Sequence, residues 1–421
     1  MVETGHRESL VTAASSKAPK LQRLDDWLGC ARGIPGHESL VTAAPAERLS
    51  SDGGYTLYGC NMTEEQTLAK LLAMCCIAVV AGFAVKTSAG EQEALRLVQT
   101  IPLPAVAGRL DHMVVDLEKK RLFVAAVANG TLEVLDLRAG KVLNTLTGIK
   151  DAQDALFLGG HFNKLYVSSL DGTLRIFQGE TFRLVQALKL EPDPNRLLYD
   201  PATDLIYFGY GGQNAGFDTY ERVGIVQAKR GAQSDQLVAD MIAPTYRPGH
   251  LAELAMDDDG KLLVCDSRAD LIFQFDTRKR ELLKSWPAHG DGAADMSLDR
   301  ARHRLFVGTR IPPEMTVYDS LSGRQIAALP GPETMDGVHY DSELKRIYMS
   351  GGRWYGTPEA SPGWVYVYQQ KDADHYELIS RILTRPGSGT SLFVPGLNRL
   401  FVASQAIGDQ EAAILVFEPV P

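Results

Sequence analysis

The sequence predicts an all-β protein, a seven-bladed β-propeller of four-stranded antiparallel blades that is closed by an N-terminal strand. Three observations lead to this prediction. One apolar strand signature returns seven times at the interval typical of propeller blades. Short strands with two-residue alternation surround every signature, and no long segment shows the three-to-four-residue spacing of a helix. One repeat domain therefore accounts for most of the 421 residues.

The signature is a short apolar run that usually begins with a basic residue. Its copies are Arg121–Val124, Lys164–Val167, Leu205–Phe208, Lys261–Val264, Arg304–Val307, Arg346–Met349 and Arg399–Val402. Aligned on Leu122, Leu165, Leu205, Leu262, Leu305, Ile347 and Leu400, the copies lie 43, 40, 57, 43, 42 and 53 residues apart. The aligned copies define blades one to seven in chain order.

Other strands complete each blade. An apolar strand that ends in Asp precedes the signature, as in His112–Asp116 and Val338–Asp341. After the signature, Asn129-Gly130 in blade one favours a tight hairpin, because both residues tolerate a positive φ. Strands such as Thr131–Asp136 and Lys141–Leu146 follow, which gives four strands per blade.

The last repeat is short of its outer strand, because it ends at Ile414–Phe417. We expect Leu95–Ile101, at the start of the domain, to supply that strand. Such a closure removes an exposed sheet edge, which otherwise invites aggregation.

The segments Val134–Lys141 and Val317–Arg324 combine a Val-x-Asp strand end with a small-residue turn and a basic residue. They resemble the YVTN-type β-propeller repeat family, and the resemblance covers about residues 95–421. It implies a seven-bladed propeller and says little about activity, because propellers host unrelated functions. The Gly-His and Trp-Asp pairs of WD40 repeats are missing from their expected places. Trp286 ends a segment that looks like a tryptophan-docking segment of quinoprotein dehydrogenases, but it has no counterpart in the other blades, so a quinone cofactor is not expected.

The first ninety residues are expected to lie outside the propeller, which occupies 91–421. Residues 62–90 contain the apolar run Leu71–Val85 followed by small residues, which is typical of a signal peptide. Retention of the run as a membrane anchor is the alternative. Residues 1–61 are expected to be a disordered extension, or untranslated sequence ahead of a start at Met62. The protein is therefore predicted to be exported, to the periplasm or the cell exterior.

Charge and cysteine content limit the partners. The net charge is -9 and no basic stripe is present, so nucleic acid is not expected to bind. Cys265 is the only cysteine after residue 90, which rules out an intramolecular disulfide in the propeller. We expect a small molecule or a protein as the partner, without stable membrane insertion of the mature domain.

Polar residues recur where the innermost strands begin, and these strand ends converge on the central channel of a propeller. We expect Asp111, Asp154, Asp295 and Asp336 to crowd around the axis, where a calcium-like divalent cation would relieve their repulsion. The competing explanation is that these side chains satisfy backbone donors at turns.

The same position supplies candidate ligand-binding residues. They are His112, Asn195, His250, Glu253 and His339. No nucleophile elbow or zinc-binding motif accompanies them. The sequence thus predicts a binding module that acts through its channel mouth and loop face. The alternative is a metal-dependent hydrolase resembling the propeller lactonases, in which a bound cation polarises a carbonyl and His250 or Glu253 moves protons.

Overall fold

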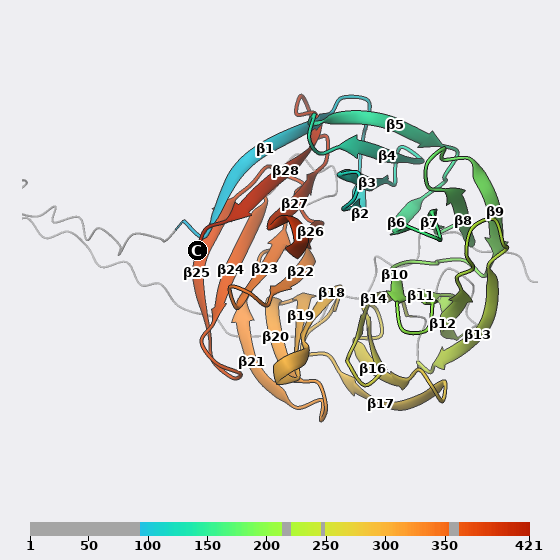
Figure 1. Cartoon of the computed structure of the whole chain (residues 1–421). Helices are drawn as coiled ribbons and strands as arrows, with labels where there is room; N and C mark the ends of the chain where they lie inside the picture. The colour runs from blue at the N-terminus through green and yellow to red at the C-terminus, as the bar shows by residue number, and fades with distance from the viewer. Residues whose placement is uncertain (1–92, 213–219, 246–248, 353–361) are drawn as a thin grey trace, which may run out of the picture. The chain divides into compact units, whose positions relative to one another are not determined.

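The computed structural model describes residues 93–212, 220–245, 249–352 and 362–421, within which seven four-stranded sheets form a ring (Figure 1). The predicted extension at 1–61 and signal peptide at 62–90 lie outside the described residues. No helix in the described part of the chain is long and apolar enough to cross a membrane. The predicted seven-bladed all-β architecture is confirmed.

Each of the first six blades is built from one continuous stretch of chain whose strands pair antiparallel in chain order. The first three blades are β2 (Leu110–Asp116), β3 (Arg121–Ala126), β4 (Thr131–Asp136) and β5 (Lys141–Thr147); β6 (Ala152–Leu158), β7 (Lys164–Ser169), β8 (Thr173–Gln178) and β9 (Leu184–Lys189); and β10 (Leu197–Asp200), β11 (Leu205–Tyr210), β12 (Glu221–Gln227) and β13 (Gln236–Ala243). The next three are β14 (Leu251–Met256), β15 (Lys261–Asp266), β16 (Leu271–Asp276) and β17 (Glu281–Pro287); β18 (Asp295–Asp299), β19 (Arg304–Arg310), β20 (Pro313–Asp319) and β21 (Gln325–Pro330); and β22 (Met335–Asp341), β23 (Arg346–Gly351), β24 (Trp364–Gln370) and β25 (Tyr376–Leu383).

Blade seven joins the two ends of the domain. It consists of β26 (Ser391–Val394), β27 (Arg399–Ser404), β28 (Ala412–Pro419) and the N-terminal strand β1 (Leu95–Leu103). Strand β1 pairs antiparallel with β28 along its length, so that the cyan β1 and the red β28 lie side by side (Figure 1). The predicted closure is confirmed.

Local turn chemistry explains why the same sequence pattern returns in every blade. The residue before each second strand adopts a positive φ, and these residues are Lys120, Asn163, Asp204, Gly260, His303, Lys345 and Asn398. In the turn after β4, Asp136 Oδ1 accepts hydrogen bonds from the backbone N–H groups of Arg138 and Ala139, and Gly140 follows with a φ of 63°. The Val-x-Asp-x-x-x-Gly pattern is therefore a turn requirement, since glycine tolerates this backbone conformation without strain.

The positive-φ residues also correct the alignment of blade three. Asp204 is the positive-φ residue there, so Leu205 occupies the place that Arg121 and Arg304 hold in other blades. The equivalent of Leu122 is then Ile206 and not Leu205. The sequence alignment was wrong by one residue in this blade because an apolar residue replaces the usual basic one.

The core is divided among the interfaces between blades, because the inner strands are covered on both faces. In β3, Leu122 and Val124 pack against blade seven, whereas Phe123 and Ala125 pack against blade two. All four side chains are fully buried. Burial of a large apolar side chain contributes roughly 1.5–3 kcal/mol, so these interfaces hold the ring together.

Candidate functional site

Strand register places one residue from each of blades two to six at the same level of the channel. Asp154 pairs with Ser168, Glu253 with Cys265, Asp295 with Gly308 and Gly337 with Ser350. In blade three the residue at this level is Arg196, directly before Leu197, which pairs with Phe208. We call Asp154, Arg196, Glu253 and Asp295 the channel ring. The sequence alignment put Asn195 at this level, and the one-residue correction replaces it with Arg196.

Small partners on the second strands let the blades converge at this level. A Cβ at Gly209 would lie 2.5 Å from Leu251 Cβ, and one at Gly308 would lie 2.2 Å from Met335 Cε. Larger residues there would push neighbouring blades apart. The ring side chains are therefore held by close packing.

Arg196 is the counterion of the ring. Its side chain forms an ion pair with Glu253 and lies 3.8 Å, Nη1 to Oδ1, from Asp154. Burial opposes the charge on Arg196, but the charges of Glu253, Asp154 and Asp295 outweigh it and raise the pKa of the guanidinium. The cation that the carboxylates require is thus supplied, at least in part, by the protein.

Asp154 and Asp295 also fasten adjacent blades. Asp154 accepts the N–H of Ala155 at 2.8 Å with one oxygen and the N–H of Leu197, in the next blade, at 2.9 Å with the other. Asp295 repeats the arrangement with Met296 at 2.6 Å and Val338 at 3.1 Å. The competing explanation from the sequence, that these carboxylates satisfy backbone donors, therefore holds for both.

Asp111 and Asp336 each pair with an arginine. Arg109 forms an ion pair with Asp111, and Arg310 Nη2 donates to Asp336 Oδ1 at 2.7 Å. The Thr390 hydroxyl donates to the other Asp336 oxygen at 2.7 Å. Burial raises the pKa of Asp111 to about 7 against the pull of Arg109, and the charges of Asp336 and Asp154 add to the rise. Asp111 is close enough to both carboxylates to sense their charge.

His250 and Asn195 belong to a hydrogen-bonded relay with Asp193. His250 Nδ1 lies 2.7 Å from Asp193 Oδ2, and Nε2 lies 2.9 Å from Asn195 Nδ2. In a neutral imidazole the Nδ1–H donates to the carboxylate, so Nε2 accepts from the Asn195 amide. The relay therefore fixes the orientation of the Asn195 amide, and His250 acts on it as a positioning residue.

The remaining predicted histidines stay neutral in the interior. Burial lowers the pKa of His339 to about 3, and its Nε2 lies 3.0 Å from the hydroxyl oxygen of Ser391. Burial and the charges of Arg196 and Arg109 also lower the pKa of His112. Ser391 and His339 do not line the cavity described next, so this Ser–His pair gives no support to nucleophilic catalysis there.

A cavity of about 300 Å³ lies where the innermost strands begin, and we call it the axial mouth. Blades one to six contribute to its lining, which is mostly polar. The lining residues are Arg109, His112, Gln153, Leu170, Asp193, Asn195, His250, Ala252, Ser267, Arg268, Ala294, Arg310 and Asp336. Three predicted ligand-binding residues, His112, Asn195 and His250, therefore line one cavity, whereas Glu253 and His339 are outside its lining.

Glu221 and Asp266 form a second group of buried carboxylates, between blades three and four. A Cβ at Gly249 would lie 2.3 Å from Glu221 Oε1 and 2.0 Å from Asp266 Oδ2, so the two carboxyl groups are neighbours. Neither Glu221 oxygen meets a hydrogen-bond donor within the described residues. Burial, with Asp266 as hydrogen-bond partner and like charge, raises the pKa of Glu221 to about 10. With this pKa, Glu221 keeps its proton at neutral pH beside the Asp266 carboxyl group.

The predicted divalent cation stays a prediction. Each of the four proposed ligands, Asp111, Asp154, Asp295 and Asp336, already has at least one donor from the protein, and only Asp336 lines the axial mouth. Among the residues that the structure describes, no group of three or more His, Cys, Asp and Glu side chains is arranged to hold a metal ion. The donor set fits a network of arginine–carboxylate pairs.

Sequence reasoning missed the residues that balance the carboxylates. Arg109 and Arg196 lie within two residues of predicted site residues, in Arg109-Leu-Asp111 and Asp193-Pro-Asn-Arg196. Basic residues beside the acidic strand starts were therefore a signal. Arg268 lies two residues after the second strand β15 and Arg310 is the last residue of the second strand β19, and no repeat pattern marks them.

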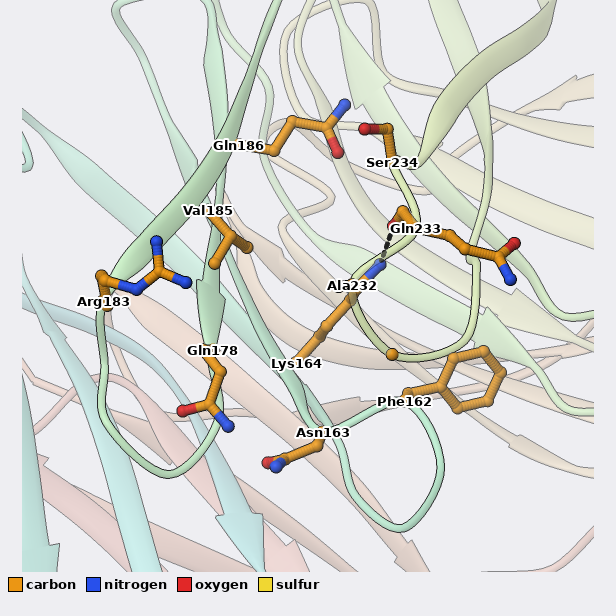
Figure 2. Close-up of a pocket in the computed structure, with 11 residues that line it drawn as sticks. Phe162, Asn163, Lys164, Gln178, Arg183, Val185, Gln186, Ala232, Gln233 and Ser234 are labelled. Carbon is orange, nitrogen blue, oxygen red and sulfur yellow. Dashed lines mark hydrogen bonds between the residues drawn. The ribbon is translucent and has the colours of Figure 1, made fainter.

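A separate cavity of about 290 Å³ lies on the outer rim between blades two and three (Figure 2). Beneath it Lys164 Nζ donates to Asp235 at 2.9 Å and to the Gln233 carbonyl at 2.8 Å, the contact drawn as a dashed line in Figure 2. Gln186 and Asp235 exchange two further hydrogen bonds. These contacts hold the loop between β12 and β13 against blade two. The rim cavity is therefore explained by the packing of this loop.

Comparison with known proteins shows the fold alone. No family model matches the chain, and no curated protein matches its sequence. Among solved structures 1725 chains match. One is the β-propeller domain of Cps50 (Swd1) from Myceliophteria thermophila, with a TM-score of 0.57 and 11% identity, covering 77% of this chain and 100% of that domain. The propeller fold is consistent with a protein-binding module, and the YVTN-type resemblance stays an expectation.

Proposed function

We propose that this chain is an exported binding propeller that takes a small polar ligand in its axial mouth. The observation that carries the proposal is the mouth cavity, whose polar side chains come from six blades and include the hydrogen-bonded relay of Asp193, His250 and Asn195. Ligand sites are concave, largely preformed and equipped with a few oriented polar groups. The mouth has these properties without requiring a change in the blades.

The geometry supports binding over hydrolysis. Both His250 ring nitrogens are engaged by Asp193 and Asn195, so neither is available to abstract a proton from a substrate. Glu253 is in an ion pair with Arg196. The two proton-transfer groups that a lactonase-like reaction would use are thus committed to the protein, and no observation favours that alternative.

A thermal-shift screen of polar metabolites tests the binding function. We expect one or more compounds to raise the melting temperature, because a ligand that binds only the folded state stabilises it. Ser267→Trp would fill the mouth and abolish the shift. Ser234→Trp, at the exposed rim cavity, is the matched control and should retain it. Shifts that survive Ser267→Trp would refute the axial mouth as the site.

Export is the second part of the proposal, and it rests on the segment 62–90. Small residues after the apolar run favour cleavage near Thr87–Gly90. Intact mass of the protein recovered outside the cytoplasm should correspond to a chain that begins there. A full-length mass in the membrane fraction would instead establish an anchor.

A further inference from the structure

Three arginines and two aspartates line the axial mouth, and two of the arginines, Arg109 and Arg310, also pair with Asp111 and Asp336. Arg109, Arg268 and Arg310 come from blades one, four and five, and Asp193 and Asp336 are the acidic lining residues. Asp193 faces His250, and Asp336 is bound by both Arg310 and Thr390. The acidic groups of the lining are therefore engaged with neighbouring residues.

Guanidinium groups suit anion recognition, because each presents five N–H donors in a planar fork. Arg310 uses Nε on the Met335 carbonyl at 3.2 Å and Nη2 on Asp336. These contacts hold the guanidinium in place against the wall of the cavity. Fixed forks lose little side-chain entropy when a carboxylate or phosphate binds.

Asn195 adds a hydrogen-bond acceptor to this lining. The relay orients its Nδ2 toward His250, and its Oδ1, which is buried, has no hydrogen-bond partner within the described residues. Asp193 Oδ1 has none there either. A buried acceptor without a donor is costly, so a ligand hydroxyl would satisfy a need that the protein leaves open.

Cavity size limits the ligand. About 300 Å³ corresponds to roughly ten water molecules at ~30 Å³ each. From these observations we infer that the axial mouth binds a small hydroxylated organic anion, whose carboxylate or phosphate is held by Arg268 and Arg310 and whose hydroxyl donates to Asn195. The inference rests on the proposed binding function and names its ligand class.

Calorimetric titration of the full chain with four probes tests the class. L-malate and glycerol 3-phosphate carry a hydroxyl with a carboxylate or a phosphate, L-malamide is the neutral counterpart of malate, and succinate lacks the hydroxyl. We expect malate or glycerol 3-phosphate to bind, and the better of the two identifies the anionic group. Malamide should bind at least about 10-fold more weakly than malate if malate binds, because the guanidiniums lose their charged partner.

Variants assign the binding to the mouth. Arg268→Gln should lower the affinity for the anion at least about 10-fold. Arg268→Lys should lower it less, because lysine keeps the positive charge but lacks the planar guanidinium fork. The exposed Arg324→Gln makes the same charge change on the β20–β21 turn and should leave the affinity unchanged. Asn195→Ala should abolish the difference between malate and succinate. Melting temperatures without ligand show whether each variant is folded.

Several outcomes would overturn the inference. If anion binding is lost in Arg183→Gln and kept in Arg268→Gln, the anion site is the rim cavity, which Arg183 lines (Figure 2), and not the axial mouth. If neutral compounds bind in a manner sensitive to Ser267→Trp while no anion does, the ligand class is wrong and the binding function stands. If no compound responds to Ser267→Trp, both proposals fail.

Discussion

Asp154 and Glu221 are buried carboxyl groups that the protein treats in different ways. Asp154 accepts one backbone N–H with each oxygen and has Arg196 nearby, and burial raises its pKa only to about 6. Glu221 has no donor within the described residues and lies against Asp266, and its pKa rises to about 10. Asp154 therefore still ionises below neutral pH, whereas Glu221 keeps its proton.

Asp295 shows that backbone N–H donors alone do not determine the pKa of a buried carboxyl group. It accepts two backbone N–H groups as Asp154 does, but burial together with the nearby charge of Glu253 raises its pKa well above the usual range. A like charge therefore offsets what the donors provide. The comparison teaches that the state of each buried carboxyl depends on the balance of N–H donors, arginine and neighbouring carboxylates.

Removal of Arg196 should have the largest effect on this balance. We expect Arg196→Met to destabilise the protein by about 3–5 kcal/mol, because the buried carboxylates of Glu253 and Asp154 lose their counterion. Urea unfolding at pH 7 measures the change. Arg222→Met is the control, since its partial exposure in the pair with Glu191 predicts a loss of about 0–1 kcal/mol. Equal losses in the two variants would refute Arg196 as the counterion of the ring.

Asp154→Asn tests the contribution of the two donors. An amide has one acceptor oxygen, so its NH₂ would face the N–H of either Ala155 or Leu197, and we expect a loss of about 1–3 kcal/mol. In the turn after β4, Asp136 accepts both of its bonds with a single oxygen. Asp136→Asn should therefore leave the urea midpoint nearly unchanged. A harmless Asp154→Asn would show that Leu197 needs no anionic partner.

The fold could be predicted from the sequence because each blade is a local unit with its own turns. Lys120 and Asp136 act within a few residues of the strands that they connect. The side chains of the channel were harder to predict, because the contacts between them depend on closure of the whole ring. In blade three Leu205 stands where the other blades have a basic residue. The sequence alignment of this blade was therefore wrong by one residue, and Arg196 was not recognised as a channel residue. The Glu221–Asp266 pair follows no repeat, so the sequence offered no signal for it.

Glu221→Gln should stabilise the protein at alkaline pH. The folded pKa of about 10 exceeds the unfolded value, so the stability from this group is complete below the unfolded pKa and is lost as pH rises toward 10. Glutamine keeps a donor to Asp266 without titrating. We expect its melting temperature to exceed that of the parent protein by roughly 2–4 °C at pH 8 and to match it at pH 4.5.

Glu133→Gln is the matched control for that change. Both Glu133 oxygens accept hydroxyl hydrogen bonds at 2.6 Å, from Thr131 and Thr145, so the amide would lose one acceptor. This variant should be less stable than the parent protein at pH 8. If Glu221→Gln is destabilising as well, the proton assigned to Glu221 is wrong.

Calcium should have the smallest effect on stability. Its effect on the melting temperature distinguishes a cation site in the channel from a network of arginine–carboxylate pairs. The predicted cation would be held by Asp111, Asp154, Asp295 and Asp336, and it would raise the melting temperature of metal-stripped protein through preferential binding to the folded state. However, Asp154 and Asp295 already accept two backbone N–H groups each, and Asp336 is bound by Arg310 and Thr390. A cation would have to displace these donors, so we expect a shift of less than about 1 °C at millimolar calcium. A larger rise that disappears in the Asp295→Asn, Asp336→Asn double variant would establish the predicted cation, and the arginine–carboxylate network would then describe only its metal-free state.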